Sequence, residues 1–266
     1  MTLSLPHAMG EIVWQRSFAH HPILAALHAG IVPILTRLVV EGGEGPISLR
    51  APLEGRSIAR LAHTVGESGE VERLLLQMWV RLEGRLGRAR GEKPAEANQP
   101  LYAGRIYAEH VFTRLFAPLA ERKITRFDLP GLPSVPPARS LWRSPNAVLA
   151  PPPSAVWLDD AMVLDEAPVV FALHHTDSNQ HVNSLVYPRL FQDAVARRLA
   201  AHGIPTKLFS RRFEVAYRKP CFAGDRLRLT LRAFADGDRL GAVGALLAEG
   251  APIDKAHCTL QAIFAL

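Results

Sequence analysis

Cysteine is scarce in this sequence of 266 residues, and long apolar runs are missing altogether. The two cysteines, Cys221 and Cys258, form no C-x-x-C pair, which argues against a disulfide framework and a structural zinc site. No stretch approaches the roughly 20 apolar residues that cross a bilayer, and the first residues lack a basic segment followed by an apolar run. We therefore expect reduced thiols, no metal or organic cofactor, and a cytoplasmic protein without a membrane span.

Charge is present without strong clustering. The net charge of +6 comes mostly from arginine, and the 48% hydrophobic content is that of an ordinary globular protein. Scattered arginines favour general solubility over a stripe that binds nucleic acid, although an acidic partner would still be attracted. Examples in the first half are Arg50, Arg56, Arg60, Arg73, Arg81, Arg85, Arg88 and Arg90.

Proline divides the chain. The segment from Leu129 to Pro153 contains LPGLPSVPPARS and APPPS, and it cannot form the interior of a helix or sheet because proline removes donors and fixes φ. The sequence therefore predicts a first domain over 1–128, a Pro-rich linker over 129–153 and a second domain over 154–266.

The second domain has the clearer pattern. APVVFALH, from Ala167 to His174, is short, apolar and typical of a buried strand. Apolar residues then recur at helical spacing from Val182 to a stop at His202-Gly203, which predicts one helix of about five turns. The remaining segments predict a four-strand meander over 213–221, 225–234, 240–250 and 256–264.

The first domain repeats this order weakly. We expect a strand at Gly10–Ser17, an apolar helix at Ile23–Val40 kinked by Pro33, and strands in ISLRAPL, RSIARLAHTV and VERLLLQMWVRLEGRL. The last segment fits a helix equally well. A further helix is expected within Arg105–Lys123. The prediction is an internal duplication of two α+β units, each a sheet around one helix.

The segment Asp177-Ser178-Asn179-Gln180-His181-Val182-Asn183 carries the chemistry. Two interpretations are open. Asp177, Ser178 or Asn179 can simply cap the predicted helix, as Asp, Ser and Asn often do. Alternatively, acidic, amide and imidazole groups gathered at the amino end of a central apolar helix form an active site, where exposed amide groups bind an oxyanion and a carboxylate activates water.

The stretch TDSNQHVNSLVYPRLFQDA resembles the hotdog thioesterase superfamily. Its D-x-N-x-H-V-N pattern followed by Tyr187 is similar to acyl-ACP thioesterases of plants and bacteria, and Y-P-R-x-F is similar to 4-hydroxybenzoyl-CoA-type acyl-CoA thioesterases. The resemblance is strong over Phe171–Asp225 and weaker from there to Leu266. It implies a double hotdog, with catalysis in the carboxyl-terminal repeat and acyl-chain selection largely in the amino-terminal one.

The resemblance also implies that Asp177, Asn179 and His181 are the catalytic group. The family's following strand ends in Y-R-R-E-C, whereas this chain has YRKPC over 217–221, so Pro220 replaces the acidic residue while Cys221 is retained. This departure argues against a mechanism that uses a Glu or a Cys nucleophile, and it shifts weight to Asp177.

In the predicted mechanism, amide groups near Val182 and Asn183 polarise a thioester carbonyl. Asp177 acts as general base toward water or as a nucleophile through an anhydride, while Asn179 and His181 orient water or stabilise charge. Tyr187 and Cys221 are further candidates for substrate or oxyanion binding. Weaker candidates are His174 and His175 before the motif, His20 and His21 in the first domain, and Glu214, which lies on a strand face that the sequence leaves open.

Three functions therefore stay open. The first is hydrolysis of an acyl-ACP or acyl-CoA thioester, as in fatty acid metabolism. The second is another reaction on the same scaffold, such as that of a dehydratase or an acyltransferase, because a fold does not determine a reaction. The third is a non-catalytic acyl-binding protein. The expected partner is the acyl-CoA or acyl carrier protein substrate, with no nucleic acid and no membrane, and the chain is expected to form a homodimer.

Overall fold

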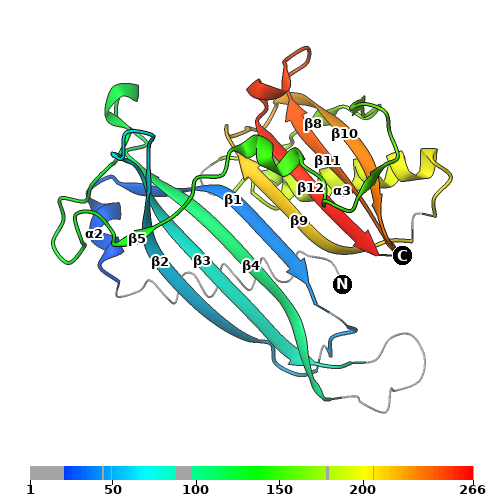
Figure 1. The fold of residues 1–266 in the computed structure, drawn as a ribbon, viewed down its shortest axis with the longest axis horizontal. Coiled ribbons are helices and arrows are strands. Elements are labelled where there is room, and N and C mark those ends of the chain that lie inside the picture. Colours follow the sequence, from blue (N-terminus) through cyan, green and yellow to red (C-terminus); the bar gives the residue numbers. More distant parts are fainter. Residues whose placement is uncertain are drawn as a thin grey trace. The chain divides into compact units, whose positions relative to one another are not determined.

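The structure, a computed structural model, describes residues 21–43, 45–48, 50–87, 98–177, 180–205 and 207–265. The chain divides into two compact units, with the boundary between Arg143 and Ser144. Each described unit is dominated by an antiparallel sheet with few helices, an α+β fold (Figure 1). Among the described residues, no helix has the length and apolar character that crossing a membrane requires.

The first unit contains one curved sheet (Figure 1). Its strands are β1 (Val32–Gly42), β2 (Glu54–Val65), β3 (Val71–Arg85), β4 (Pro100–Thr113) and the short β5 (Ala138–Arg139), with α2 (Ile23–His28) before them and η1 (Leu119–Glu121) after β4. The order is β1-β4-β3-β2-β5, antiparallel except for the β2–β5 pair. Residues of β3 and β4 pack with α2 into the core, among them Leu74, Leu76, Met78 and Phe112.

Two helices predicted in this unit are wrong. Of the helix expected at Ile23–Val40, only the first six residues form a helix, α2. The helix ends because Gly30 has a φ of +73°, and the chain then continues as strand β1. The sequence of β1 is rich in β-branched residues, and Pro33 lies near its start, where a strand tolerates proline. The helix expected within Arg105–Lys123 is mostly β4, whereas the strands predicted in RSIARLAHTV and VERLLLQMWVRLEGRL are confirmed as β2 and β3. The strand expected at Gly10–Ser17 lies outside the described residues.

The second unit is a sheet with one long helix, α3 (Val186–Ala201). Its long strands are β9 (Phe209–Tyr217), β10 (Arg226–Asp236), β11 (Arg239–Leu247) and β12 (Cys258–Ala265), in the order β9-β12-β11-β10. Three two-residue strands pair with the outer edge of β10: β6 (Val156–Trp157), β7 (Val163–Leu164) and β8 (Val169–Val170). Short 3-10 turns are η2 (Pro145–Leu149), η3 (Leu173–His175) and η4 (Ile253–Lys255).

The four predicted strands are confirmed here, but the predicted meander is wrong. Only β10, β11 and β12 follow one another in the sheet, and β9 pairs with β12 instead of β10. Of the strand expected at Ala167–His174, only the two residues of β8 form a strand, and the 3-10 turn η3 follows. The first unit has the same order, since β1 also pairs with the last of its four long strands.

Both faces of the second sheet are covered, so β11 and β12 are buried along nearly their whole length. α3 lies along one face (Figure 1), and Gly244 of β11 permits this close approach, because a Cβ there would lie 2.6 Å from a ring atom of Phe191. The opposite face carries η2, and two hydrogen bonds tie this segment to β12: Thr259 Oγ1 donates to Pro145 O, and Gln261 Nε2 donates to the carbonyl of Ala150, the residue after η2.

Ion pairs fix the carboxyl-terminal half of α3 to the segment that borders β10. Arg197 donates to both oxygens of Asp165, and Arg198 donates to the buried carboxylate of Asp159. Asp159 also accepts hydrogen bonds from His202 Nε2 and from the N–H of Ala233 in β10. The helix that follows the candidate motif is therefore held in place at its far end.

Candidate active site

The motif forms a tight hairpin turn. The N–H of Asp177 donates to the carbonyl of His181 at 2.9 Å, the N–H of Gln180 donates to the carbonyl of Asp177 at 3.0 Å, and Thr176 pairs with Val182. Gln180 has a φ of +62°, the left-handed residue that closes a three-residue hairpin loop. Asp177 and His181 therefore face each other across the base of the turn, and Ser178 and Asn179 lie outside the described residues.

The turn is separate from the helix, so the interpretation of Asp177 as a helix cap is wrong. α3 begins at Val186, four residues later than predicted from Val182, and its N-cap is Leu185, without a capping side chain. Asn183 supports the approach to the helix instead: its Oδ1 accepts the N–H of Leu185 at 2.9 Å, and its carbonyl accepts the N–H of Val186 at 2.9 Å. The backbone geometry gives the exposed Asp177 no role in starting the helix.

The two backbone amides expected to bind an oxyanion are engaged within the protein. The N–H of Val182 donates to Cys221 O at 2.8 Å, and the N–H of Asn183 donates to His175 O at 2.8 Å. The oxyanion role predicted for these two amides is therefore not supported by their geometry. The side-chain amide of Asn183 is different, because Nδ2 has no acceptor among the described residues while Oδ1 is fixed by Leu185.

Aromatic side chains cluster around the start of α3. The buried Tyr187 ring contacts Tyr217 at 5.5 Å and Phe171 at 5.8 Å between centroids, and Tyr217 donates its hydroxyl to Ser184 O at 2.9 Å. Burial raises the pKa of both tyrosines well above the ordinary value, so both hydroxyls stay protonated. The ring of His181 lies 5.2 Å from that of Phe222, which joins the turn to the chain after β9.

Cys221 is fully buried next to this aromatic cluster, and its neighbour His257 could not be predicted from the sequence. Its Sγ lies 3.3 Å from Nδ1 of His257, 36 residues away, and it also shares a hydrogen bond with Tyr187. Burial raises the pKa of the Cys221 thiol to about 11, so the thiolate that a nucleophile requires is scarce at neutral pH. The contact with His257 therefore does not activate the thiol.

Glu214 cannot replace the acid missing at Pro220. It is buried on the face of β9 that carries its ion pair with Arg212 at 2.5 Å, and Arg212 in turn donates to Gln261, whose amide reaches η2. Tyr217, three residues further along the strand, points to the opposite face and reaches the loop before α3.

Two of the weaker histidine candidates, His175 and His21, accept hydrogen bonds from the backbone. His175 accepts the N–H of Ala172 on Nδ1, and burial together with the neighbouring His174 lowers its pKa. In the first unit, His21 Nδ1 accepts the N–H of Ile23 at the start of α2, and His20 lies outside the described residues. No group of three or more metal-ligating side chains occurs in the described part of the chain.

The fold has relatives of known structure. No protein-family model matches the chain, and no curated protein matches its sequence. Among solved structures, the chain is similar to an acyl-ACP thioesterase from Bacteroides thetaiotaomicron, with a TM-score of 0.57 and 15% identity over 99% of this chain and 89% of that one. It is also similar to a 12:0-ACP thioesterase from Umbellularia californica, with a TM-score of 0.51 and 14% identity over 91% of this chain and 75% of that one. The predicted resemblance to hotdog thioesterases is thereby confirmed at the level of the fold.

Proposed function

We propose that this protein hydrolyses an acyl thioester, carried by an acyl carrier protein or CoA, to a free acid and a thiol. The observation that carries the proposal is the hairpin turn over 177–181, which holds an exposed carboxylate opposite a histidine and uses neither as a helix cap. The similarity in fold to two acyl-ACP thioesterases supports the same reaction class.

We propose further that the chain is a double hotdog, with repeats over 1–128 and 154–266 and a linker over 129–153. The equal strand order in the two units supports a duplication. Within the linker, β5 pairs with β2 of the first unit, whereas η2 packs on β12 of the second, so each half of the linker supports a different sheet. In this proposal the second repeat performs the chemistry, and the first, which lacks the motif, shapes acyl-chain selection.

The proposed reaction is carried by three residues of the turn. In one route, Asp177 accepts a proton from water as the water oxygen attacks the thioester carbonyl carbon, and that proton passes to the sulfur as the C–S bond breaks and the thiol leaves. In the other, a carboxylate oxygen of Asp177 attacks that carbon and expels the thiolate to form an anhydride, which water then hydrolyses to the free acid and Asp177 while the thiolate takes up the proton. Asn179 and His181 orient the water and stabilise developing charge. Because the amides of Val182 and Asn183 are engaged, the donor to the carbonyl oxygen is proposed to be Nδ2 of Asn183.

The test is release of free thiol from a panel of acyl-ACP and acyl-CoA thioesters. Asp177→Asn should lower turnover about 100-fold or more, because it removes base or nucleophile while retaining size. Asp193→Asn, the same change at an exposed position of α3, is the matched control and should be neutral. Unchanged hydrolysis in Asp177→Asn contradicts the assignment. Conversion without thiol release indicates another reaction of this scaffold, and saturable binding alone indicates an acyl-binding protein.

A further inference from the structure

One face of the first sheet carries arginines directly opposite one another. Arg56 of β2 is paired in register with Arg81 of β3, and Arg81 with Arg105 of β4. Two residues along, Ile58, Trp79 and Tyr107 form a parallel apolar row across the same strands. These six residues are named here the arginine-aromatic face. Like charges directly opposite one another destabilise a sheet, so a row of three requires compensation.

Ion pairs within the protein compensate two of these three arginines. Arg105 is paired with Glu41 of β1 at 2.5 Å, and Arg81 with Glu83 at 2.8 Å in an exposed contact. Arg56, which is exposed, has no ion-pair partner among the described residues. The central Ile58 is 70% exposed and Trp79 is 36% exposed, although both lie in the middle of a strand. An unbalanced positive row beside exposed apolar side chains is the composition of an interface core, where Trp, Tyr and Arg are enriched.

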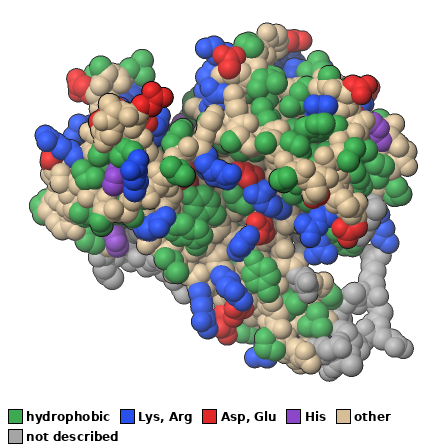
Figure 2. Space-filling view, in the orientation of Figure 1, with side chains coloured by type: hydrophobic (Ala, Val, Ile, Leu, Met, Phe, Trp, Pro, Cys, Tyr) green, Lys and Arg blue, Asp and Glu red, His purple; other side chains and the backbone are tan. Residues whose placement is uncertain are grey.

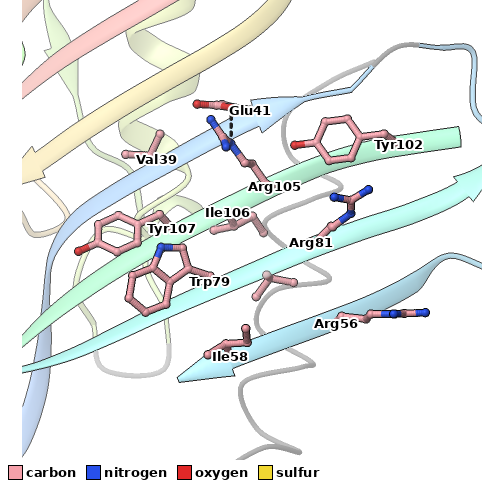
Figure 3. Close-up of a pocket in the computed structure, with 11 residues that line it drawn as sticks. Val39, Glu41, Arg56, Ile58, Trp79, Arg81, Tyr102, Arg105, Ile106 and Tyr107 are labelled. Atoms are coloured by element: carbon pink, nitrogen blue, oxygen red, sulfur yellow. Dashed lines mark hydrogen bonds and ion pairs between the residues drawn. The ribbon is translucent and has the colours of Figure 1, made fainter. Parts of the chain in front are cut away.

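Figure 3 shows the three arginines of the row together with Trp79, Tyr102 and Tyr107, and one of the three, Arg81, stacks on a ring. Trp79 and Tyr107 lie 5.3 Å apart between centroids, Arg60 of β2 lies over Trp79 at 5.1 Å, and Arg81 lies over Tyr102 at 5.3 Å. This stacking orders Arg60 and Arg81 in advance, which lowers the entropy lost when they bind carboxylates. It also occupies a face of each ring that a stacked nucleobase would need.

The face is large and positively charged. The hollow above it has a volume of about 860 Å³, and an adjoining hollow of about 530 Å³ shares Trp79 and Tyr107 with it. The second hollow adds Arg139 and Arg143, both exposed. Figure 2 shows basic side chains standing among hydrophobic ones on the side of the first unit that faces the viewer. Two adjoining open hollows exceed the space that one small ligand fills.

We propose that the arginine-aromatic face, with the adjoining Arg139 hollow, is a docking surface for an acidic protein that presents a row of carboxylates. A second copy of this chain would bring the same positive row and repel it, and the occupied ring faces disfavour nucleic acid. The inference rests on the proposed function for the identity of the partner: a carrier protein that bears the acyl thioester. The arginines steer and hold the carrier, and the apolar row forms the contact centre.

The test uses the full chain and a double charge reversal, Arg56→Glu with Arg139→Glu. These two arginines lie in different hollows and are exposed, so both can be changed without opening the core. Arg239→Glu, the same reversal at the exposed start of β11, is the matched control. The probe is a purified, fluorescently labelled acyl carrier protein, titrated by anisotropy at low and high salt. CoA and a single-stranded oligonucleotide are competing probes.

We expect the double variant to weaken binding of the carrier at least 10-fold and to raise KM for a carrier-borne thioester, with the control unchanged and affinity falling as salt rises. Hydrolysis of the acyl-CoA ester should stay within twofold. If the double variant and the control bind the carrier with equal affinity, the docking surface is wrong. It is also wrong if the protein binds the oligonucleotide or CoA in preference to the carrier and the charge reversal abolishes that binding. If the charge reversal abolishes carrier binding but the protein hydrolyses no thioester, the docking surface is supported and the proposed function is refuted.

Discussion

The buried carboxylate of Asp159 gives a quantitative test of how α3 is held. Its side chain is 1% exposed and accepts Arg198 Nε at 2.9 Å, His202 Nε2 at 2.7 Å and the N–H of Ala233 at 2.7 Å. Asp159→Ala leaves the Ala233 amide buried without an acceptor, which costs about 1–3 kcal/mol. Breaking a fully buried ion pair costs about 3–5 kcal/mol, but the Arg198 side chain is 27% exposed and regains water. We therefore expect a loss of about 3 kcal/mol in the free energy of unfolding.

The assay is urea unfolding followed by tryptophan fluorescence in a background where three of the four tryptophans are Phe. The remaining Trp157 pairs with Phe234 of β10 and reports the second unit. A double-mutant cycle with Arg198→Ala should give a coupling free energy of at least about 1 kcal/mol, since the two side chains are in direct contact. A loss below about 1 kcal/mol in Asp159→Ala, together with no coupling to Arg198, would refute the reasoning.

The same carboxylate determines a pH dependence. Burial alone raises the pKa of Asp159, but hydrogen bonds from Arg198, the Ala233 amide and His202 outweigh it, so the folded-state pKa is lowered. A carboxyl whose pKa is depressed on folding stabilises the protein above its unfolded value of about 3.9, and this contribution is lost as pH falls through the folded pKa. The stability difference between wild type and Asp159→Asn should therefore be present at pH 5 and shrink as the pH falls below about 4.

Two further predictions concern the candidate site. Gln180→Gly should keep the rate of hydrolysis and the melting temperature at or above the wild-type values, because glycine adopts the φ of +62° without strain. Gln180→Val should reduce both quantities, because a β-branched residue does not tolerate this φ. If circular dichroism and thiol release show equal behaviour of the two variants, the turn geometry is contradicted. Cys221→Ala should retain thioester hydrolysis within about threefold at pH 7, because burial raises the thiol pKa to about 11; a loss of about 100-fold would make the thiol the nucleophile.

The strands of the second unit could be predicted because short β-rich segments alternate there with clear turn signals. The first unit was harder, since ILAALHAGIVPILTRLVV satisfies helical spacing throughout. Gly30 determines the structure of this segment. Its left-handed backbone conformation ends α2 after six residues, and the β-branched residues that follow form β1. Hydrophobic spacing alone does not distinguish the two states in so apolar a segment.

The motif could be identified from the sequence, but not its local structure. A D-S-N triplet before an apolar helix fits both a cap and a hairpin turn, and only the position of Leu185 at the N-cap separates them. The proximity of His257 to Cys221 depends on pairing between strands far apart in sequence. The arginine row had a usable signal, since Arg56, Ile58 and Arg60 alternate as one face of a strand, but its alignment with Arg81 and Arg105 required the register.

Because Pro220 replaces the family's acidic residue, the question is whether other residues could activate the Cys221 thiol. By residue type, Cys221, His257 and Asp225 resemble a nucleophile, a base and an orienting acid. Their electrostatics oppose that role: burial raises the thiol pKa, the negative charge of Asp225 raises it further, and Asp225 Oδ2 already accepts the N–H of Phe222 at 2.9 Å. A thiol kept protonated beside a buried tyrosine argues against a nucleophilic role for Cys221, so the proposed chemistry rests on the turn itself, with the exposed carboxylate of Asp177 and the half-buried imidazole of His181.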